Sequence, residues 1–149
     1  RCADAAGADA VVLAGASVDP YNGKAVRASA GSLFHQPVVV AASVSQTVST
    51  LKRRGLVVIA ADGAGEASLD DLSPATLRAP TAWLFGNEAW GLSVDVRALA
   101  DRVVRVPIYG RAESLNLATA AAVCLYTSAR EQHRGTGERT VTPGTPGKG

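Results

Sequence analysis

Two stretches of the chain decide how it folds: Leu84-Phe85-Gly86-Asn87-Glu88-Ala89-Trp90-Gly91-Leu92-Ser93 and Val106-Pro107-Ile108-Tyr109-Gly110-Arg111-Ala112-Glu113-Ser114-Leu115-Asn116-Leu117-Ala118. Each stretch follows an apolar, strand-like run and gathers glycine and polar side chains where a strand of a parallel sheet would end. Open α/β sheets bind ligands at the carboxyl ends of their strands. The two stretches therefore predict one composite pocket with polar, non-metal chemistry.

Around these stretches, short apolar runs alternate with helical patterns. Strands are predicted at residues 11–14, 37–41, 56–60, 81–85 and 102–106, and helical segments at 24–30, 45–54, 68–72, 94–100 and 115–130. Ser45 is the expected N-cap of the second helical segment, and Gly55 is expected to end it. The strands are continuous apolar runs, which are typical of a parallel sheet whose two faces are both covered. The sequence thus predicts an α/β fold with a parallel sheet and helices on both faces.

The composition limits the class of protein. A chain of 149 residues with 47% apolar residues is expected to form one globular domain. No apolar run is long enough to cross a bilayer and no secretory signal is visible, so we expect a cytoplasmic protein without a membrane partner. Cys2 and Cys124 form no CxxC pair, and His35 and His133 are isolated, so we expect free thiols and no metal site.

Both ends of the chain differ from the middle. Residues 1–7 are typical of the last turns of a helix that ends at Gly7 without an N-cap before it, which predicts a preceding segment outside this sequence. From Gly135 onward the chain is rich in Gly, Thr and Pro. We therefore expect one domain at residues 1–132 and a disordered tail at residues 133–149.

Three motifs in order resemble a known family. Residues 85–92 are similar to the FGxExxGL motif of the SpoU (TrmH-like) RNA ribose methyltransferases of the SPOUT superfamily, and residues 107–118 are similar to their IPMxGxxxSLNVSxA motif. Arg1-Cys2-Ala3 matches the end of their first motif, NxGxxxRxA, whose leading Asn and Gly are missing here. Tyr109 stands where the family has Met, and Leu117-Ala118-Thr119 replaces Val-Ser-x. Three motifs in order are a far more specific signal than one.

The resemblance implies a fold, a cofactor and a reaction. Its fold would be an α/β domain with a C-terminal trefoil knot, and its members work as homodimers. Its activity would be methyl transfer from S-adenosylmethionine to a ribose 2′-hydroxyl of RNA, most often 23S-type ribosomal RNA. Many relatives carry a further N-terminal RNA-binding domain, which fits the abrupt start of this chain. Transfer RNA as the substrate, or a non-catalytic relative that binds RNA or cofactor, stay open as alternatives.

The resemblance also assigns roles to residues. Arg1, Ser114 and Asn116 would be catalytic, and Glu88 would brace its loop or the dimer partner. S-adenosylmethionine would be held by the two motif loops, at Leu84, Gly86, Gly91, Ile108, Gly110 and Leu117. Lys24, Arg27 and Arg111 are candidate RNA phosphate contacts.

Each of these residues also has an ordinary structural explanation. Ser114 and Asn116 taken alone would most often cap a helix, with Ser114 capping Leu115 onward. Lys24 and Arg27 taken alone would most often form a solvated face, and Arg1 would be an exposed helix residue. A nucleotide-binding α/β hydrolase is disfavoured because the chain has neither a P-loop nor a Ser-His-Asp set. Only the ordered set of three motifs outweighs these explanations.

Overall fold

A computed structural model describes residues 1–87 and 90–134 of the chain. Its elements, in order, are α1 (Cys2–Ala5), β1 (Val11–Ala14), α2 (Gly23–Ser29), the 3-10 turn η1 (Ser32–Phe34), β2 (Val38–Ala41), α3 (Val44–Arg53), β3 (Val57–Ala61), β4 (Ala67–Ser68), the 3-10 turn η2 (Leu69–Asp71), α4 (Pro74–Arg78), β5 (Thr81–Phe85), α5 (Val94–Ala98), β6 (Arg102–Arg105) and α6 (Leu117–Arg134). All five predicted strands are present, so the alternation of strands and helices is confirmed.

The strands are parallel but form two sheets rather than the single sheet expected. The larger sheet has the order β4-β6-β3-β5, and β1 pairs with β2 in a separate two-stranded sheet. Ile59 of β3 lies opposite Trp83 of β5 on one side and Arg102 of β6 on the other. Apolar periodicity identifies strands one at a time and carries no information on which strands pair, which is why the division into two sheets was not predicted.

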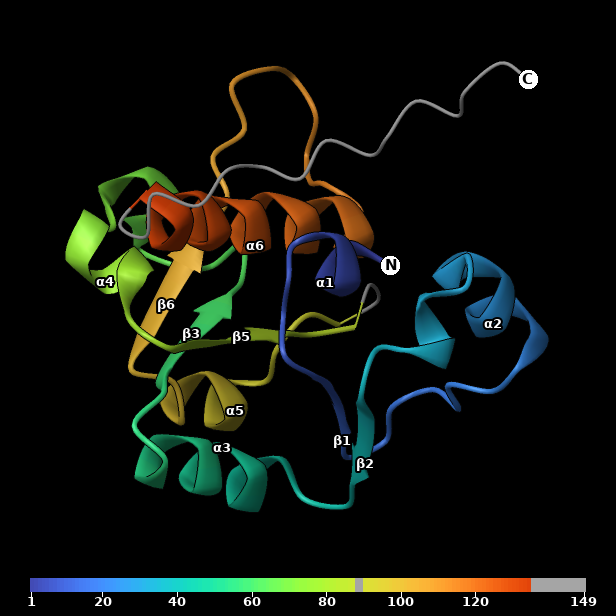
Figure 1. Cartoon of the computed structure of the whole chain (residues 1–149). Helices are drawn as coiled ribbons and strands as arrows, with labels where there is room; N and C mark the ends of the chain where they lie inside the picture. Colours follow the sequence, from blue (N-terminus) through green and yellow to red (C-terminus); the bar gives the residue numbers. More distant parts are fainter. Residues whose placement is uncertain (88–89, 135–149) are drawn as a thin grey trace.

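Helices cover both faces of the larger sheet, as predicted. α6 and α4 lie on one side of it, while α3 and α5 lie on the other (Figure 1). Val58, Ile59 and Ala60 in the middle of β3 are at most 1% exposed, which explains why this strand is apolar at every position. The fold is therefore mixed α/β, with β3 at the centre of its core.

The packing of α6 on the sheet completes the core. Cys124 of α6 is fully buried and belongs to the cluster built around Ile59 and Val104. The indole Nε1 of Trp83 donates a hydrogen bond to the hydroxyl of Ser128 at 3.0 Å, so the polar end of a half-buried Trp on β5 is satisfied by the helix above it. Burial raises the pKa of the Cys124 thiol to about 12.

Most helix starts follow the capping rules, with some displacements from the prediction. Ser43, and not Ser45, accepts the backbone N–H of Gln46, so α3 begins one residue earlier than expected. α4 was missed, although Ser73 followed by Pro74 is a regular start signal for a helix. α6 begins two residues later than predicted and continues to Arg134, past the domain boundary expected after residue 132. The rest of the expected tail, residues 135–149, lies outside the described residues.

None of the helices in the described part of the chain combines the length and the apolar character that crossing a membrane requires.

Candidate active site

The two motif loops leave the same edge of the larger sheet. β5 and β6 both run parallel to β3 and lie on either side of it, so their carboxyl ends point the same way. The loop between β6 and α6 projects from the body of the molecule (orange in Figure 1). Within this loop Gly110, Arg111 and Ser114 are all exposed to solvent. The strand order thus places both loops where parallel sheets bind ligands.

The turn after β5 is folded tightly on itself. A Cβ atom added to Gly86 would lie 2.1 Å from the carbonyl carbon of Gly91, and Gly91 adopts a φ of +62°. The backbone N–H of Gly91 donates to the carbonyl of Asn87 at 3.0 Å. We expected Gly86 to let a ligand approach the backbone; what passes beside it is the backbone of Gly91. Glu88, which was expected to brace this loop, lies outside the described residues.

Asp62 is a residue of this edge that sequence reasoning did not single out. It is the first residue after β3, and one of its carboxylate oxygens accepts the backbone N–H of Leu92 at 3.1 Å. The other oxygen lies 3.3 Å from Nη1 of Arg97. The signal was available, because Asp62 follows a buried strand just as the two motif loops do, and the same rule on strand ends applies to it.

Asn116 caps α6. Its side-chain oxygen accepts the backbone N–H of Thr119 at 2.8 Å, and its carbonyl accepts the N–H of Ala120 at 3.0 Å. The expectation that Ser114 would cap a helix beginning at Leu115 is therefore wrong, because the helix begins at Leu117. Since the amide oxygen is used in the cap, Asn116 keeps its amide N–H₂ as the group that can donate to a substrate.

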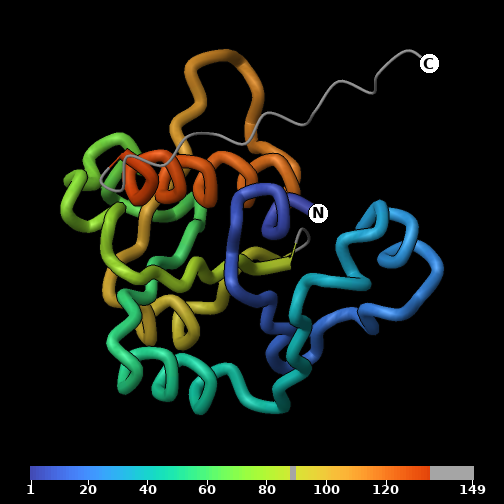
Figure 2. The backbone as a smooth tube through the Cα atoms, in the orientation of Figure 1, coloured from blue at the N-terminus to red at the C-terminus, as the bar shows by residue number. Residues whose placement is uncertain are grey.

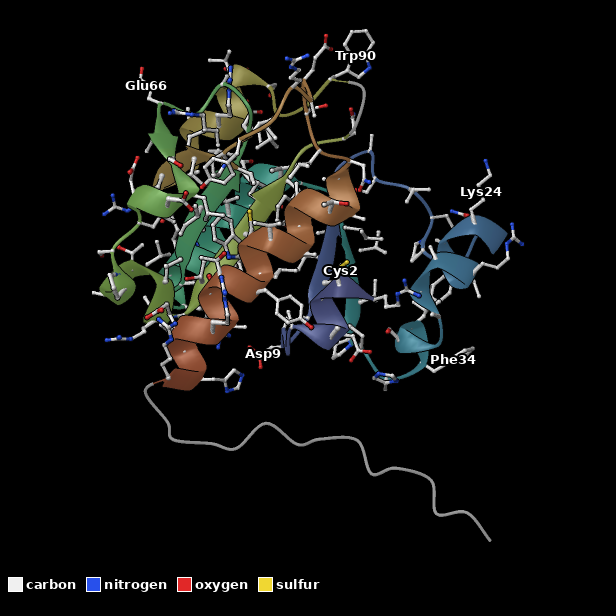
Figure 3. All side chains as sticks on the ribbon, turned by 90° about the horizontal axis from the view of Figure 1, so that it is seen from above. Cys2, Asp9, Lys24, Phe34, Glu66 and Trp90 are labelled. Carbon is white, nitrogen blue, oxygen red and sulfur yellow. The ribbon has the colours of Figure 1, made fainter. Side chains whose placement is uncertain are left out.

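The beginning of the chain meets the beginning of α6. The thiol of Cys2 lies 3.5 Å from the carbonyl oxygen of Ala118, and the hydroxyl of Tyr126 donates to the carbonyl of Ala5 at 3.1 Å. Figure 2 shows the blue N-terminal segment beside the start of α6, and Figure 3 shows Cys2 lying next to that helix. Arg1 is the exposed residue immediately before Cys2, at the start of the helix that packs against α6.

Neither of two hollows on the described surface is lined by the motif loops. One, of about 180 Å³, is bordered by Arg1, by Ala25 and Ser29 of α2, and by apolar residues of β1 and β2. The other, of about 270 Å³, lies between β2 and α3. A shared cavity between the two motif loops therefore stays a prediction. The loops do expose apolar surface: Ile108 is 37% and Leu117 36% exposed, and the half-buried Leu84 and Gly86 lie at the end of β5.

The candidate phosphate contacts form two groups. Lys24 and Arg27 are exposed on α2, the helix that also borders the hollow with Arg1, and Lys24 points away from the body of the molecule (Figure 3). Arg111 belongs to the projecting loop between β6 and α6, and this loop is well separated from α2 in Figure 1. The structure therefore does not gather the three side chains into one patch.

An aromatic residue anchors the projecting loop to η2. The hydroxyl of Tyr109 donates a hydrogen bond to a carboxylate oxygen of Asp70 in η2. This contact raises the pKa of the Tyr109 hydroxyl, because the neighbouring carboxylate favours the neutral phenol. At the tip of the other loop Trp90 is 86% exposed and points outward (Figure 3).

The described residues form a parallel α/β domain. Two glycine-bearing loops lie at the carboxyl edge of its larger sheet, and the first helix of the chain packs against α6, which follows the second loop. This arrangement is typical of a ligand-binding α/β domain. Residues 1–126 match the SpoU rRNA Methylase family, and the chain belongs to this family.

Relatives and solved structures agree with this assignment. The chain is 37% identical over 147 residues, 95% of its length and 49% of the relative's, to the 23S rRNA (uridine(2479)-2′-O)-methyltransferase of Streptomyces viridochromogenes. It is 39% identical over 126 residues, 85% of its length and 49% of the relative's, to the 23S rRNA (guanosine(2553)-2′-O)-methyltransferase of Bacillus subtilis. The crystal structure of the SpoU methyltransferase AviRb from Streptomyces viridochromogenes in complex with AdoMet superposes with a TM-score of 0.80 at 37% identity, over 90% of this chain and 54% of that one. The chain thus spans about half the length of the relatives that it matches.

Proposed function

We propose that this chain is the catalytic domain of an S-adenosylmethionine-dependent methyltransferase that modifies a ribose 2′-hydroxyl of 23S-type ribosomal RNA. One observation carries the proposal: residues from opposite ends of the chain come together, with Cys2 in contact with Ala118. This contact supports a site shared by Arg1 and Asn116, because Cys2 follows Arg1 and Ala118 lies two residues after Asn116. Arg1 and Asn116 are both residues for which the family resemblance implies catalysis.

The residues of the two loops fit the proposed cofactor. An adenosyl group needs apolar surface for its faces and backbone groups for its edges. Ile108 and Leu117 offer exposed apolar surface, and a Cβ atom added to Gly110 would meet no atom within 4 Å apart from its chain neighbours. We infer that S-adenosylmethionine is held by these residues together with Leu84, Gly86 and Gly91.

The chemistry required of the protein is the activation of an alcohol. S-adenosylmethionine supplies an electrophilic methyl group carried on a sulfonium. A ribose hydroxyl is a weak nucleophile at neutral pH, so its proton must be removed or hydrogen-bonded away. The guanidinium of Arg1 would lower the pKa of the hydroxyl by placing positive charge beside the developing alkoxide. Because arginine stays protonated, a phosphate oxygen of the RNA is the more suitable proton acceptor.

Two further side chains would orient the hydroxyl. The amide N–H₂ of Asn116 would donate a hydrogen bond to the 2′-oxygen, since the amide oxygen is held in the helix cap. The exposed hydroxyl of Ser114, two residues earlier, would hold the neighbouring reacting groups. Lys24 and Arg27 would contact RNA phosphates from α2, and Arg111 would do so from the projecting loop.

Four further properties complete the proposal. We expect a C-terminal trefoil knot that α6 threads, because the family resemblance implies one. We expect a homodimer, because α6 exposes Val123 and Tyr126 and the loops expose Trp90 and Tyr109. The site is expected to need no metal, and the protein to act in the cytoplasm, where ribosomal RNA is found.

A transfer assay tests the reaction. The protein is incubated with methyl-labelled S-adenosylmethionine and either unmodified ribosomal RNA or transfer RNA, and the modified position is mapped by primer extension. Label at a ribose of 23S-type RNA is the expected result, while label in transfer RNA alone would favour the alternative substrate. Cofactor binding by calorimetry without transfer to any RNA would instead identify a non-catalytic relative and reject the proposed reaction.

A further inference from the structure

We propose that Asp62 is a positioning residue that holds the turn after β5 in the shape that binds S-adenosylmethionine. This inference rests on the proposed function. Nothing in the family's motifs, as they are matched above, includes Asp62. Its contacts, however, join three separate elements at the edge of the sheet where the cofactor is expected.

Both carboxylate oxygens of Asp62 accept hydrogen bonds. Oδ2 accepts the backbone N–H of Leu92 at 3.1 Å. Oδ1 accepts the backbone N–H of Ala64 at 2.9 Å and pairs with the guanidinium of Arg97 of α5 at 3.3 Å. The backbone N–H of Asp62 itself donates to the carbonyl of Val104 in β6 at 2.9 Å. Asp62 is thereby fixed to the sheet while its side chain holds the turn and α5.

The side chains of this cluster are partly shielded from water, which strengthens the hydrogen bonds between them. The side chain of Asp62 is 11% exposed and that of Arg97 is 26% exposed. A carboxylate shielded from water is stabilised by its charged partner and by the backbone N–H groups that it accepts. Removal of the carboxylate would leave the N–H of Leu92 and the guanidinium of Arg97 without this acceptor.

The turn after β5 links the position of Leu92 to that of Gly86, one of the proposed cofactor contacts. A Cβ atom on Gly91 would lie 3.2 Å from Oδ2 of Asp62, so this glycine passes directly beside the carboxylate. The backbone of Gly91 in turn packs against Gly86, closer than any side chain would allow. A shift of Leu92 and Gly91 therefore displaces the end of β5, where Gly86 is expected to meet the cofactor.

The chain contains a matched control at the opposite edge of the sheet. Asp101, just before β6, accepts the backbone N–H of Val58 at 2.8 Å and pairs with Lys52 at 2.8 Å. It therefore combines a backbone N–H and a cation as Asp62 does, although its side chain is more exposed, at 40%. Because Val58 is near the start of β3, this carboxylate stabilises the fold far from the motif loops.

The test compares the two aspartates by calorimetry and steady-state kinetics, with S-adenosylmethionine as the titrated ligand and ribosomal RNA as the second substrate. Asp62→Ala is expected to raise the Kd and the KM for S-adenosylmethionine on the order of tenfold, the effect of losing one charge-assisted hydrogen bond, with the KM for RNA little changed. Asp62→Asn keeps an oxygen that can accept the Leu92 N–H, so it should recover part of the affinity. Asp101→Ala should lower the melting temperature and leave cofactor affinity at the wild-type value.

Several outcomes would overturn the inference. Wild-type affinity in a folded Asp62→Ala protein would do so, and so would an equal loss of affinity in Asp101→Ala. If Asp62→Ala does not fold, Asp62→Asn and Arg97→Ala are compared with Asp101→Ala in its place. Wild-type affinity for S-adenosylmethionine in both variants would then reject the positioning role of Asp62. Wild-type protein that does not bind S-adenosylmethionine would reject the proposed function first, and the role of Asp62 with it.

Discussion

Asn116 has two roles at the residue scale, and they can be separated. Its amide oxygen caps α6 by accepting the N–H of Thr119, while its amide N–H₂ is the proposed donor to the substrate oxygen. A cap and a substrate contact thus share one side chain but use different atoms. Substitutions that remove one atom at a time can therefore tell structure from catalysis.

Asn116→Asp is expected to keep the cap and lose the donor, whereas Asn116→Ala loses both. Both variants should be inactive in methyl transfer with cofactor affinity close to wild type. Only Asn116→Ala should lose stability, by about 1 kcal/mol, the usual cost of removing an N-cap. Urea unfolding and the transfer assay measure the two effects, and an active Asn116→Asp enzyme would refute the catalytic role of the amide.

Substitutions at Gly86 and Gly110 are expected to have opposite effects, although both glycines were expected to help hold the cofactor. A Cβ on Gly86 meets the backbone of Gly91 at 2.1 Å, whereas a Cβ on Gly110 meets nothing within 4 Å. Gly86→Ala should therefore distort the turn and abolish cofactor binding in calorimetry. Gly110→Ala should fold normally and show at most a modest loss. Equal affinities for the two variants would show that the tight turn is not needed for binding.

At the scale of the elements, the carboxylate of Asp4 helps to position α1. Asp4 accepts the hydroxyl of Ser32 at 2.6 Å and lies 2.8 Å from Nε2 of His35, so α1 is tied to η1. The hydrogen bond from Ser32, followed by that from His35, lowers the pKa of Asp4 below its ordinary value of 3.8. This tie holds the helix that carries Arg1.

The pKa of Asp4 makes the tie dependent on pH. Because the folded-state pKa is lower than the unfolded one, the unfolded chain binds more protons in acid, and stability rises with pH. The advantage of wild type over Asp4→Asn in urea unfolding should be full above about pH 5 and should shrink as pH falls below about 4, toward the folded-state pKa. An advantage that stays constant across this range would show that the charge of Asp4 does not stabilise the fold.

The elements differ in how far their sequence predicts them. β1, β2, β3, β5 and β6 were predictable, because buried parallel strands are continuous apolar runs, and β4 was not, because two residues carry no period. Apart from α4, which was missed, the starts of the predicted helices α2, α3, α5 and α6 were correct to within two residues. For α3, Ser43 and Ser45 are both possible caps and only packing chooses between them. The motif loops could be placed at strand ends by rule. The contact of Cys2 with Ala118 of α6 could not, since nothing local in either segment encodes a contact across 116 residues.

At the scale of the whole molecule, several large apolar side chains are exposed on the described surface. Trp90 and Tyr109 on the loops and Val123 and Tyr126 on α6 are all exposed. Large exposed apolar side chains that gather near a functional site mark a surface that another molecule covers. The family resemblance makes a second copy of the chain the expected occupant.

The chain is therefore expected to be a dimer in solution. Light scattering at micromolar concentration should give about twice the chain mass of 15.2 kDa. Charged substitutions at Val123, which is 38% exposed and projects from α6, should shift the mass toward the monomer. Lys24→Glu on α2 is the matched surface control and should leave the mass unchanged. A monomeric wild type would remove the dimer from the proposal.

The contact between Cys2 and Ala118 has a consequence for biosynthesis. The segment around Cys2 lacks its α6 partner until Ala118 has been synthesised, because the contact spans 116 residues of the chain. Contacts between such distant segments are slow to close and are absent from any shorter nascent chain. The proposed site, which combines Arg1 with Asn116, would then form only after α6 has been synthesised.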